Sequence, residues 1–156
     1  MNENFDNWFS NSITIDTNGK PIIFYHRSRN KEGFSEFKIE GVEKNDFNND
    51  YGVYFVIKEH KSFIDYIADG CEFYCYLRIK NPLYIYDILN EIKDSRGMNY
   101  LHLDLNQHFC KQVINEGYDG IIIVSNYYNQ YIVFEPNQIK HIHNTGTFDS
   151  SNDIYC

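Results

Sequence analysis

The chain has 156 residues, which is the size of one domain with a single core. Its formal net charge is -8, and an acidic surface repels phosphate backbones, which argues against nonspecific nucleic-acid binding. No apolar run reaches the length of a membrane span, and no basic-then-apolar leader opens the chain. We therefore expect a protein without membrane association that acts in the cytoplasm, either of the producing cell or of an invaded host cell.

The cysteines do not form a metal or disulfide pattern. They are Cys71, Cys75, Cys110 and Cys156. Cys71 and Cys75 fall in one strand-like run, where residues four apart lie roughly 13 Å from each other, too far for one metal or one disulfide. His102, His108 and Cys110 are near neighbours, but no second cysteine pair completes a zinc pattern. We expect buried free thiols and no bound metal.

The first half of the chain alternates β-prone runs with turns. Residues 13–23 predict two short strands around a turn at 18–21, and 22–26 is an apolar run that ends in polar residues. Residues 34–47 predict a loop with one helical turn, and 48–50 predict a turn before a strand at 52–56. From 58 to 69 apolar side chains recur at helical spacing, and Gly70 follows where a C-terminal cap belongs.

The second half opens with a strand at 71–79, in which Phe73, Cys75, Leu77 and Ile79 share one face. The remaining expected strands are 83–86, 120–124, 130–134 and 139–142, and the remaining helices are 88–93 and 104–116. The continuous apolar run at 120–124 predicts a central strand, with 130–134 as its antiparallel partner after a tight loop. Residues 144–156 are polar and are expected to fray.

These elements predict a single α+β domain over residues 1–143, followed by a polar C-terminal tail over 144–156. Short, mostly antiparallel strands would form two packed sheets with flanking helices. Three polar side chains stand in its β-prone runs, namely His26, Tyr54 and Gln130. Each one alone is most often structural. Brought to one cleft, however, an imidazole, a phenol ring and a carboxamide can hold a ribose-rich ligand through hydrogen bonds.

In order and rough spacing, the three segments resemble NAD-dependent ADP-ribosyltransferases with a histidine–tyrosine–acid triad. These include poly(ADP-ribose) polymerases and the transferase domains of phage polyvalent proteins. The resemblance covers about Trp8 to Ile142. It implies an ADP-ribosyltransferase-like split β-sandwich that binds NAD as its substrate across the two sheets and needs no metal.

The first segment is similar to the His-Gly-Ser signature of that family. The resemblance gives His26 a contact to a ribose hydroxyl of NAD, and Ser28 keeps the family's third position. Arg27 replaces the glycine whose backbone clamps the nicotinamide amide. Its Cβ stands where glycine permits close approach of a ligand. Its guanidinium could instead serve the pyrophosphate.

The second segment matches the family's Gly-x-Tyr-Phe motif. The resemblance stacks Tyr54 on the nicotinamide ring and places Phe55 in the NAD pocket. Lys61 and Ser62 follow at the spacing found in the polymerases. Tyr66 lies one position beyond the family's second stacking tyrosine, and such a slip on a helix rotates a side chain by about 100°.

The third segment, 129–134, resembles the family's Asn-Glu-Tyr-Ile-Val-Tyr stretch, and Gln130 stands where the catalytic glutamate is found. A glutamine can accept a hydrogen bond from the 2′-hydroxyl of the nicotinamide ribose, but it brings no negative charge to the transition state. Glu135 is the alternative acid, although strand alternation turns it to the opposite face. Asp119 lies in a Tyr-Asp-Gly turn and is expected to be structural.

The resemblance implies a mono-ADP-ribosyltransferase that releases nicotinamide and modifies a protein acceptor, as a phage or toxin-type effector. Because a glutamate is usually associated with chain elongation, Gln130 favours single transfer. Two alternatives stay open. One is an NAD glycohydrolase, in which water replaces the acceptor. The other is a catalytically degenerate protein that binds NAD or blocks a partner. The sequence does not indicate an oligomeric state.

Overall fold

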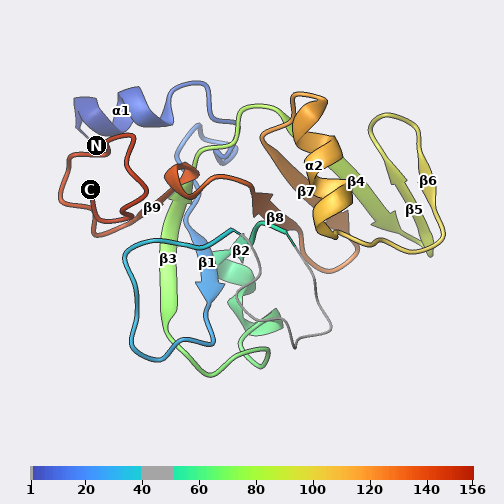
Figure 1. Ribbon diagram of the computed structural model, residues 1–156, viewed down its shortest axis with the longest axis horizontal. Coiled ribbons are helices and arrows are strands. Elements are labelled where there is room, and N and C mark those ends of the chain that lie inside the picture. The colour runs from blue at the N-terminus through green and yellow to red at the C-terminus, as the bar shows by residue number, and fades with distance from the viewer. Residues whose placement is uncertain (1, 40–50) are drawn as a thin grey trace.

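The computed structural model describes residues 2–39 and 51–156 (Figure 1). Within these ranges, hydrogen bonds join nine strands into one sheet in the order β6-β5-β4-β7-β8-β2-β1-β3-β9. The strands are β1 (Phe24–Arg27), β2 (Val53–Ile57), β3 (Glu72–Leu77), β4 (Pro82–Ile88), β5 (Glu91–Asp94), β6 (Asn99–Tyr100), β7 (Gly120–Ser125), β8 (Gln130–Val133) and β9 (Ile139–His141). The helices are α1 (Glu3–Phe9) and α2 (Gln107–Asn115), with short 3-10 helices η1 (Lys58–Phe63) and η2 (Pro136–Gln138).

The sheet confirms a mixed α and β fold built on mostly antiparallel strands, with β4 and β7 as a parallel pair. The expected division into two packed sheets is not confirmed. The nine strands form one continuous sheet because β2 pairs with β1 along one edge and with β8 along the other. The split sandwich implied by the resemblance is therefore replaced, in hydrogen-bonding terms, by one long sheet.

Two cores lie on opposite faces of this sheet because side chains alternate along each strand. On β8, Ile132 belongs to the core shared with α2, whereas its neighbour Val133 belongs to the core on the other side. The predicted face of β3, formed by alternate apolar residues, is buried as expected. β7 runs between β4 and β8 and is buried over most of its length, which confirms it as a central strand.

The pair of strands expected at 13–23 is shorter than predicted. The two arms meet around the expected turn in one antiparallel bridge, between Ile15 and Pro21. The carboxylate of Asp16 accepts hydrogen bonds from the amides of Asn18 and Lys20, each at 2.8 Å. These two bonds satisfy turn amides locally, so the segment closes as a turn before a strand pair can extend.

Two predicted helices are corrected. Residues 88–93 form a hairpin between β4 and β5, in which Leu89 and Asn90 have φ of 54° and 64°. Pairing with β4 satisfies backbone groups that a helix of six residues would leave open at both ends. The helix expected over 58–69 is reduced to η1 and following turns. Gly70 is not its cap but lies against the backbone of Ser28 and Asn30.

α2 confirms the helix expected over 104–116, with a later start. The side chain of Asn106 accepts a hydrogen bond from the amide of Phe109 and caps the helix there. Gly117 follows the helix with φ of 91°, as predicted for a C-terminal glycine. The loop expected over 34–47 is observed as irregular chain over 34–39; its remainder and the turn at 48–50 lie outside the described residues.

Both ends of the chain pack against β3 and β9 (Figure 1). α1 was not expected from the sequence and buries an aromatic cluster of Phe5, Trp8 and Phe9. The expected fraying of residues 144–156 is wrong, because Ile154 is fully buried in the core and pairs with the backbone of His141. The polar residues of this segment form turns in the structure, although their composition alone indicates a free tail.

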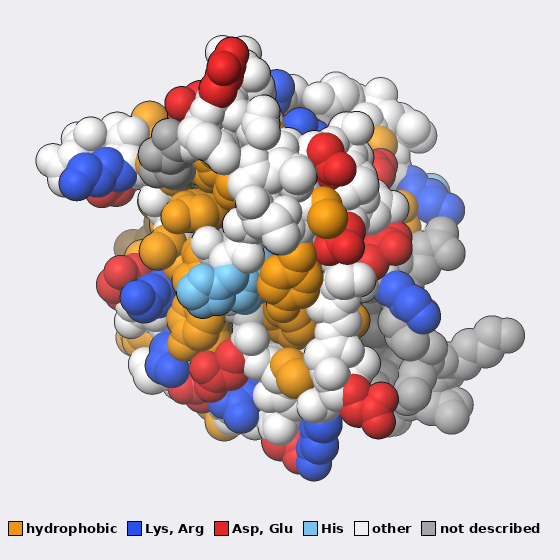
Figure 2. All heavy atoms as spheres, turned by 90° about the vertical axis from the view of Figure 1, so that its left-hand side faces the viewer, with side chains coloured by type: hydrophobic (Ala, Val, Ile, Leu, Met, Phe, Trp, Pro, Cys, Tyr) orange, Lys and Arg blue, Asp and Glu red, His pale blue; other side chains and the backbone are white. Residues whose placement is uncertain are grey.

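The surface carries charged side chains of both signs. On the face drawn in Figure 2, acidic and basic side chains are interspersed. Among the residues that the structure describes, no helix is long and apolar enough to pass through a bilayer.

All four cysteines are free thiols, with Cys75 and Cys110 buried and the other two half-buried. The prediction of free thiols is confirmed, with two of them less buried than expected.

Candidate active site

The candidate site lies where β1 and β2 separate. The two strands pair at Phe24–Ile57 and Tyr25–Val56, and the next residue of β1 is His26. Nδ1 of His26 donates a hydrogen bond to the carbonyl oxygen of Tyr54 at 2.8 Å. The imidazole thus spans the gap at which the backbone ladder between the two strands stops. The first and second predicted triad positions are brought together by this contact.

Burial fixes the chemical state of His26. Its ring packs against Phe37 and Phe55, with centroids 5.1 and 5.3 Å away. Desolvation lowers the pKa of His26, and the hydrogen bond to the Tyr54 carbonyl opposes this shift in part. The neutral ring uses Nδ1–H as its donor, which leaves Nε2 as a hydrogen-bond acceptor. An acceptor of this kind suits a hydroxyl group, such as one of a ribose.

A cavity of about 610 Å³ opens beside His26, within the range of small-molecule sites. One wall comes from the end of β1, with His26, Ser28 and the loop to Asn30. A second wall is the irregular segment 34–38, and the third is formed by residues 52–54. Gly52 has φ of 102°, and a Cβ there would stand 2.7 Å from Ile132. The glycine of the Gly-Val-Tyr-Phe motif is therefore needed to bring β2 against β8.

Gln130 begins β8, half-buried, but is not among the residues that line this cavity. Tyr54 pairs with Ile132, so Gln130, Ile132 and Tyr54 share the sheet face that carries α2. His26 packs with Phe37 and Phe55 on the other face. The structure thus places the third triad position one strand away from the cavity, across β2.

Arg27 does not stand free for a pyrophosphate. Its Nη1 lies 3.2 Å from Glu72 and 3.5 Å from Asp65, and Asp65 also accepts a hydrogen bond from the hydroxyl of Tyr25 at 2.5 Å. The pKa of Asp65 is lowered, first by the hydrogen bond from Tyr25 and also by Lys61 and Arg27. Arg27 thus forms internal ion pairs, one of which holds the 58–69 segment on β1, and its contact to a pyrophosphate stays a prediction.

The other expected NAD-binding residues lie outside the cavity. Tyr66 is 82% exposed and borders a second cavity, of about 510 Å³, beside Arg27, so it does not form a sandwich with Tyr54. Lys61 donates to the hydroxyl of Tyr74 at 3.3 Å, and Ser62 is exposed. Phe55 is 1% exposed and supports His26 from the core.

The two acids weighed as alternatives have structural roles. Glu135 is exposed and caps η2 together with Gln138, away from the cavity. Asp119 accepts hydrogen bonds from the amides of Lys80 and Asn81, at 2.7 and 2.8 Å. Both observations agree with the predicted orientation and turn. Within residues 2–39 and 51–156, no group of three or more His, Cys, Asp or Glu side chains could hold a metal ion.

Sequence reasoning missed the second wall of the cavity. Phe34 and Phe37 pack edge to face at 4.8 Å and, with Lys38, line the cavity from a segment that was expected to be a plain loop. Two phenylalanines in an otherwise polar stretch were the signal that this segment folds inward. Asp65 was also missed, although it occupies the position at which the family has its second stacking ring.

β1 and β2 separate at His26, and a ligand-sized cavity lined also by Gly52 and Tyr54 opens there. This arrangement is the one expected of an ADP-ribosyltransferase. A family model for ADP-ribosyltransferases in polyvalent proteins matches residues 16–148. The chain belongs to this family. No curated protein and no solved structure matches it.

Proposed function

We propose that the protein is an NAD-dependent mono-ADP-ribosyltransferase that modifies a protein acceptor, as a phage or toxin-type effector. Membership of the family supports ADP-ribosyl transfer. The observation that carries the proposal is the hydrogen bond from His26 to the Tyr54 carbonyl, because it leaves Nε2 of a neutral imidazole as an acceptor in a residue that lines a ligand-sized cavity. The net charge of -8 favours a protein over a nucleic-acid acceptor.

In the proposed reaction, the bond between the ribose anomeric carbon and the nicotinamide nitrogen breaks, and nicotinamide leaves with the bonding electrons. A nucleophile of the acceptor attacks the same carbon and gives up its proton. His26 holds a ribose hydroxyl through Nε2. Gln130 lies one strand from the cavity, so its proposed role requires the ligand to extend across β2 to the start of β8. There its neutral carboxamide orients a hydroxyl without stabilising the positive charge that develops on the sugar. This difference supports single transfer.

Labelled NAD incubated with cell extract tests this function. We expect label on protein with the wild-type chain, and at least about a hundredfold less with His26→Ala, since removing one positioned group commonly costs that much. Gln130→Ala is expected to lose label to a smaller extent. The matched control is His102→Ala, which removes an exposed histidine outside the site. Label transfer that survives both site substitutions refutes the assignment.

A second candidate is a degenerate NAD-binding protein, and the placement of Gln130 and Tyr66 outside the cavity favours it. Calorimetric binding of NAD without release of nicotinamide would select this reading. Release of nicotinamide with free ADP-ribose as product, and no labelled protein, would select a glycohydrolase instead.

A further inference from the structure

The C-terminal segment 149–156 lies beyond the region matched by the family model, yet it contacts the wall of the cavity. Ile154 uses both of its backbone groups. Its carbonyl accepts from the amide of His141 at the edge strand β9, and its amide donates to the carbonyl of Ser35, each at 2.8 Å. One residue therefore bridges the edge of the sheet to the irregular segment 34–38.

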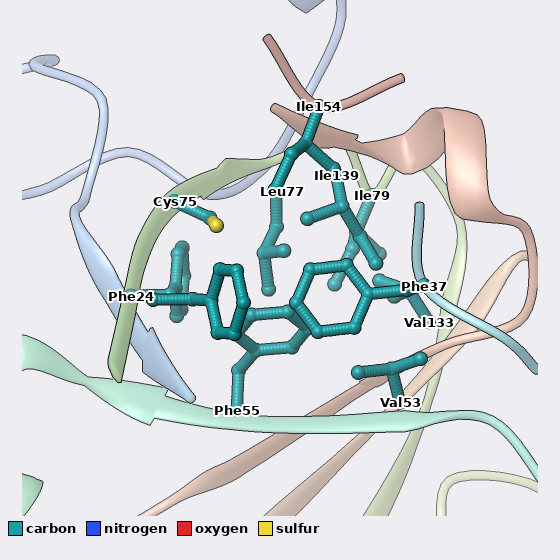
Figure 3. Close-up of a cluster of buried hydrophobic side chains, with 11 residues drawn as sticks. Phe24, Phe37, Val53, Phe55, Cys75, Leu77, Ile79, Val133, Ile139 and Ile154 are labelled. Atoms are coloured by element: carbon teal, nitrogen blue, oxygen red, sulfur yellow. The ribbon is translucent and has the colours of Figure 1, made fainter. Parts of the chain in front are cut away.

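The side chain of Ile154 adds a packing contact to this bridge. It is fully buried and belongs to the same core as Phe37. In Figure 3, Ile154 lies at the top of the cluster, and Ile139 lies between it and Phe37. Phe37 in turn meets the ring of His26 edge to face at 5.1 Å. One buried core thus connects the C-terminal segment to Phe37, and Phe37 contacts the imidazole of the site.

A buried cation keeps the segment in place. Lys140 of β9 is completely buried, and its Nζ donates to the carbonyl oxygens of Asp153 and Ser151 at 2.7 and 3.1 Å. It also lies 3.4 Å from Asp149. A buried ammonium is costly without such partners, so the carbonyls of this segment are held close to β9.

A polar contact completes the attachment. The amide nitrogen of the Asn152 side chain donates to Glu36 at 2.9 Å, and Glu36 lines the cavity. The segment therefore contacts 34–38 through two hydrogen bonds, one from the backbone of Ile154 and one from the side chain of Asn152. The side chain of Ile154 also belongs to the core that contains Phe37.

We propose that segment 149–156 is a positioning element of the ligand site, with Ile154 as the residue that sets the 34–38 wall against His26. This inference rests on the proposed function for its ligand, which is NAD. The segment does not touch the ligand. It fixes the place of Phe37, Lys38 and Glu36, and so determines the shape of the cavity that the dinucleotide enters.

The test compares Ile154→Ala with Ile154→Val in the full chain. Ile85→Ala is the matched control, because Ile85 is equally buried but belongs to the core on the opposite side of the sheet. At a temperature where all variants are folded, we expect Ile154→Ala to raise the Kd for NAD about tenfold, which is a loss of about 1.4 kcal/mol. Ile154→Val and Ile85→Ala are expected to stay near the wild-type value. Equal weakening by Ile154→Ala and Ile85→Ala would overturn the proposal.

Hydrogen exchange of the free protein separates this inference from the proposed function. We expect faster exchange of the backbone amides of 34–38 in Ile154→Ala and unchanged exchange in Ile85→Ala. If the wild-type chain does not bind NAD, the proposed function fails, and this exchange result alone decides the positioning role. Identical protection of 34–38 in the wild type and in Ile154→Ala would overturn it.

Discussion

Gln130 and His26 occupy two triad positions, and the structure gives them different surroundings. His26 is enclosed by aromatic rings and bonded to β2, whereas Gln130 is half-buried on the α2 face of β8. The imidazole is therefore held before any ligand arrives. The carboxamide makes no described hydrogen bond within residues 2–39 and 51–156, so its chemistry depends on what the ligand brings.

Gln130→Glu is expected to speed nicotinamide release by about tenfold, because a charged hydrogen bond is roughly twice as strong as a neutral one and stabilises the developing cation. The measurement is the rate of nicotinamide release at saturating NAD. Glu135→Gln is the control, since it changes a charge on an exposed residue of the opposite orientation. An unchanged rate in Gln130→Glu, with NAD binding intact, would show that Gln130 lies outside the reacting centre.

His26 makes the stability of the protein sensitive to acid. Burial lowers its pKa below the ordinary value of 6.5. Above pH 6.5 the ring is neutral in both the folded and the unfolded chain, so stability is unaffected. As the pH falls below this value, the unfolded chain binds a proton first, and stability declines until the folded pKa is passed. Urea unfolding at pH 7.5 and 5.5 should show a smaller decline in His26→Gln than in the wild type. An equal decline in both chains would contradict the burial of this ring.

Among the elements of the site, the loop that follows β1 depends on close backbone packing at Gly70. A Cβ at this position would stand 2.3 Å from the carbonyl oxygen of Ser28 and 2.5 Å from that of Asn30. Both residues line the cavity. The loop between β1 and segment 34–38 is therefore held by a contact that only a residue without a side chain permits.

Gly70→Ala is expected to destabilise the protein by roughly 1–3 kcal/mol, because backbone atoms must move to accept the methyl group. It should also weaken NAD binding, since Ser28 and Asn30 shift with the loop. Gly97→Asn is the control, because φ is 87° there, asparagine tolerates this region, and a Cβ would meet nothing within 4 Å. Chemical denaturation measures the first effect and calorimetry the second. A Gly70→Ala protein as stable as the wild type would refute the close packing.

The strands of this sheet were predictable from the sequence because alternation is a local signal. β3, β7 and β8 lie where alternating or continuous apolar runs placed them. The short helices were not predictable. Residues 88–93 satisfy a helical period and still form a hairpin, because β4 offers partners that the sequence window does not contain. At 58–69, the ion pair of Asp65 with Arg27 spans 38 residues and overrides the local pattern.

The candidate site was predictable in part for the same reason. His26 and Tyr54 follow from short motifs, and the structure joins them through the backbone carbonyl of Tyr54. The ring of Tyr54 lies on the α2 face, so its stacking on nicotinamide stays a prediction. The positions of Tyr66 and Gln130 relative to the cavity depend on the path of the chain after β2 and on the twist of one long sheet. Neither of these two positions is determined by the few residues around it in the sequence. The cavity wall at 34–38 depends on Ile154, which lies more than a hundred residues away in the chain.

Within the nine-stranded sheet, the cavity lies at a narrow connection, which has as few residue pairs as the one between β5 and β6. β1 and β2 are joined by two residue pairs, while β4 and β7 are joined by six. A ligand that contacts both the β1 wall and the β2 wall adds contacts across this connection. Binding is therefore expected to stabilise the folded protein globally, beyond the few residues it touches.

NAD should accordingly raise the thermal unfolding midpoint. At a concentration one hundred times its Kd, a ligand that binds only the folded state adds about 2.7 kcal/mol to the free energy of unfolding. Differential scanning calorimetry with increasing NAD measures the shift, and nicotinamide alone serves as the comparison ligand. His26→Ala is expected to lose most of the shift. A shift of equal size in His26→Ala would show that NAD binds elsewhere.

The seam between β1 and β2 is held by more than its two residue pairs. On one side of it lie β1, β3 and β9, and on the other lie the strands from β2 to β6. Side chains from both sides, among them Phe24 and Phe55, pack into one core. The imidazole of His26 crosses the seam through its hydrogen bond to the Tyr54 carbonyl, so a side chain of the site itself ties the two parts of the sheet together where the strand ladder ends.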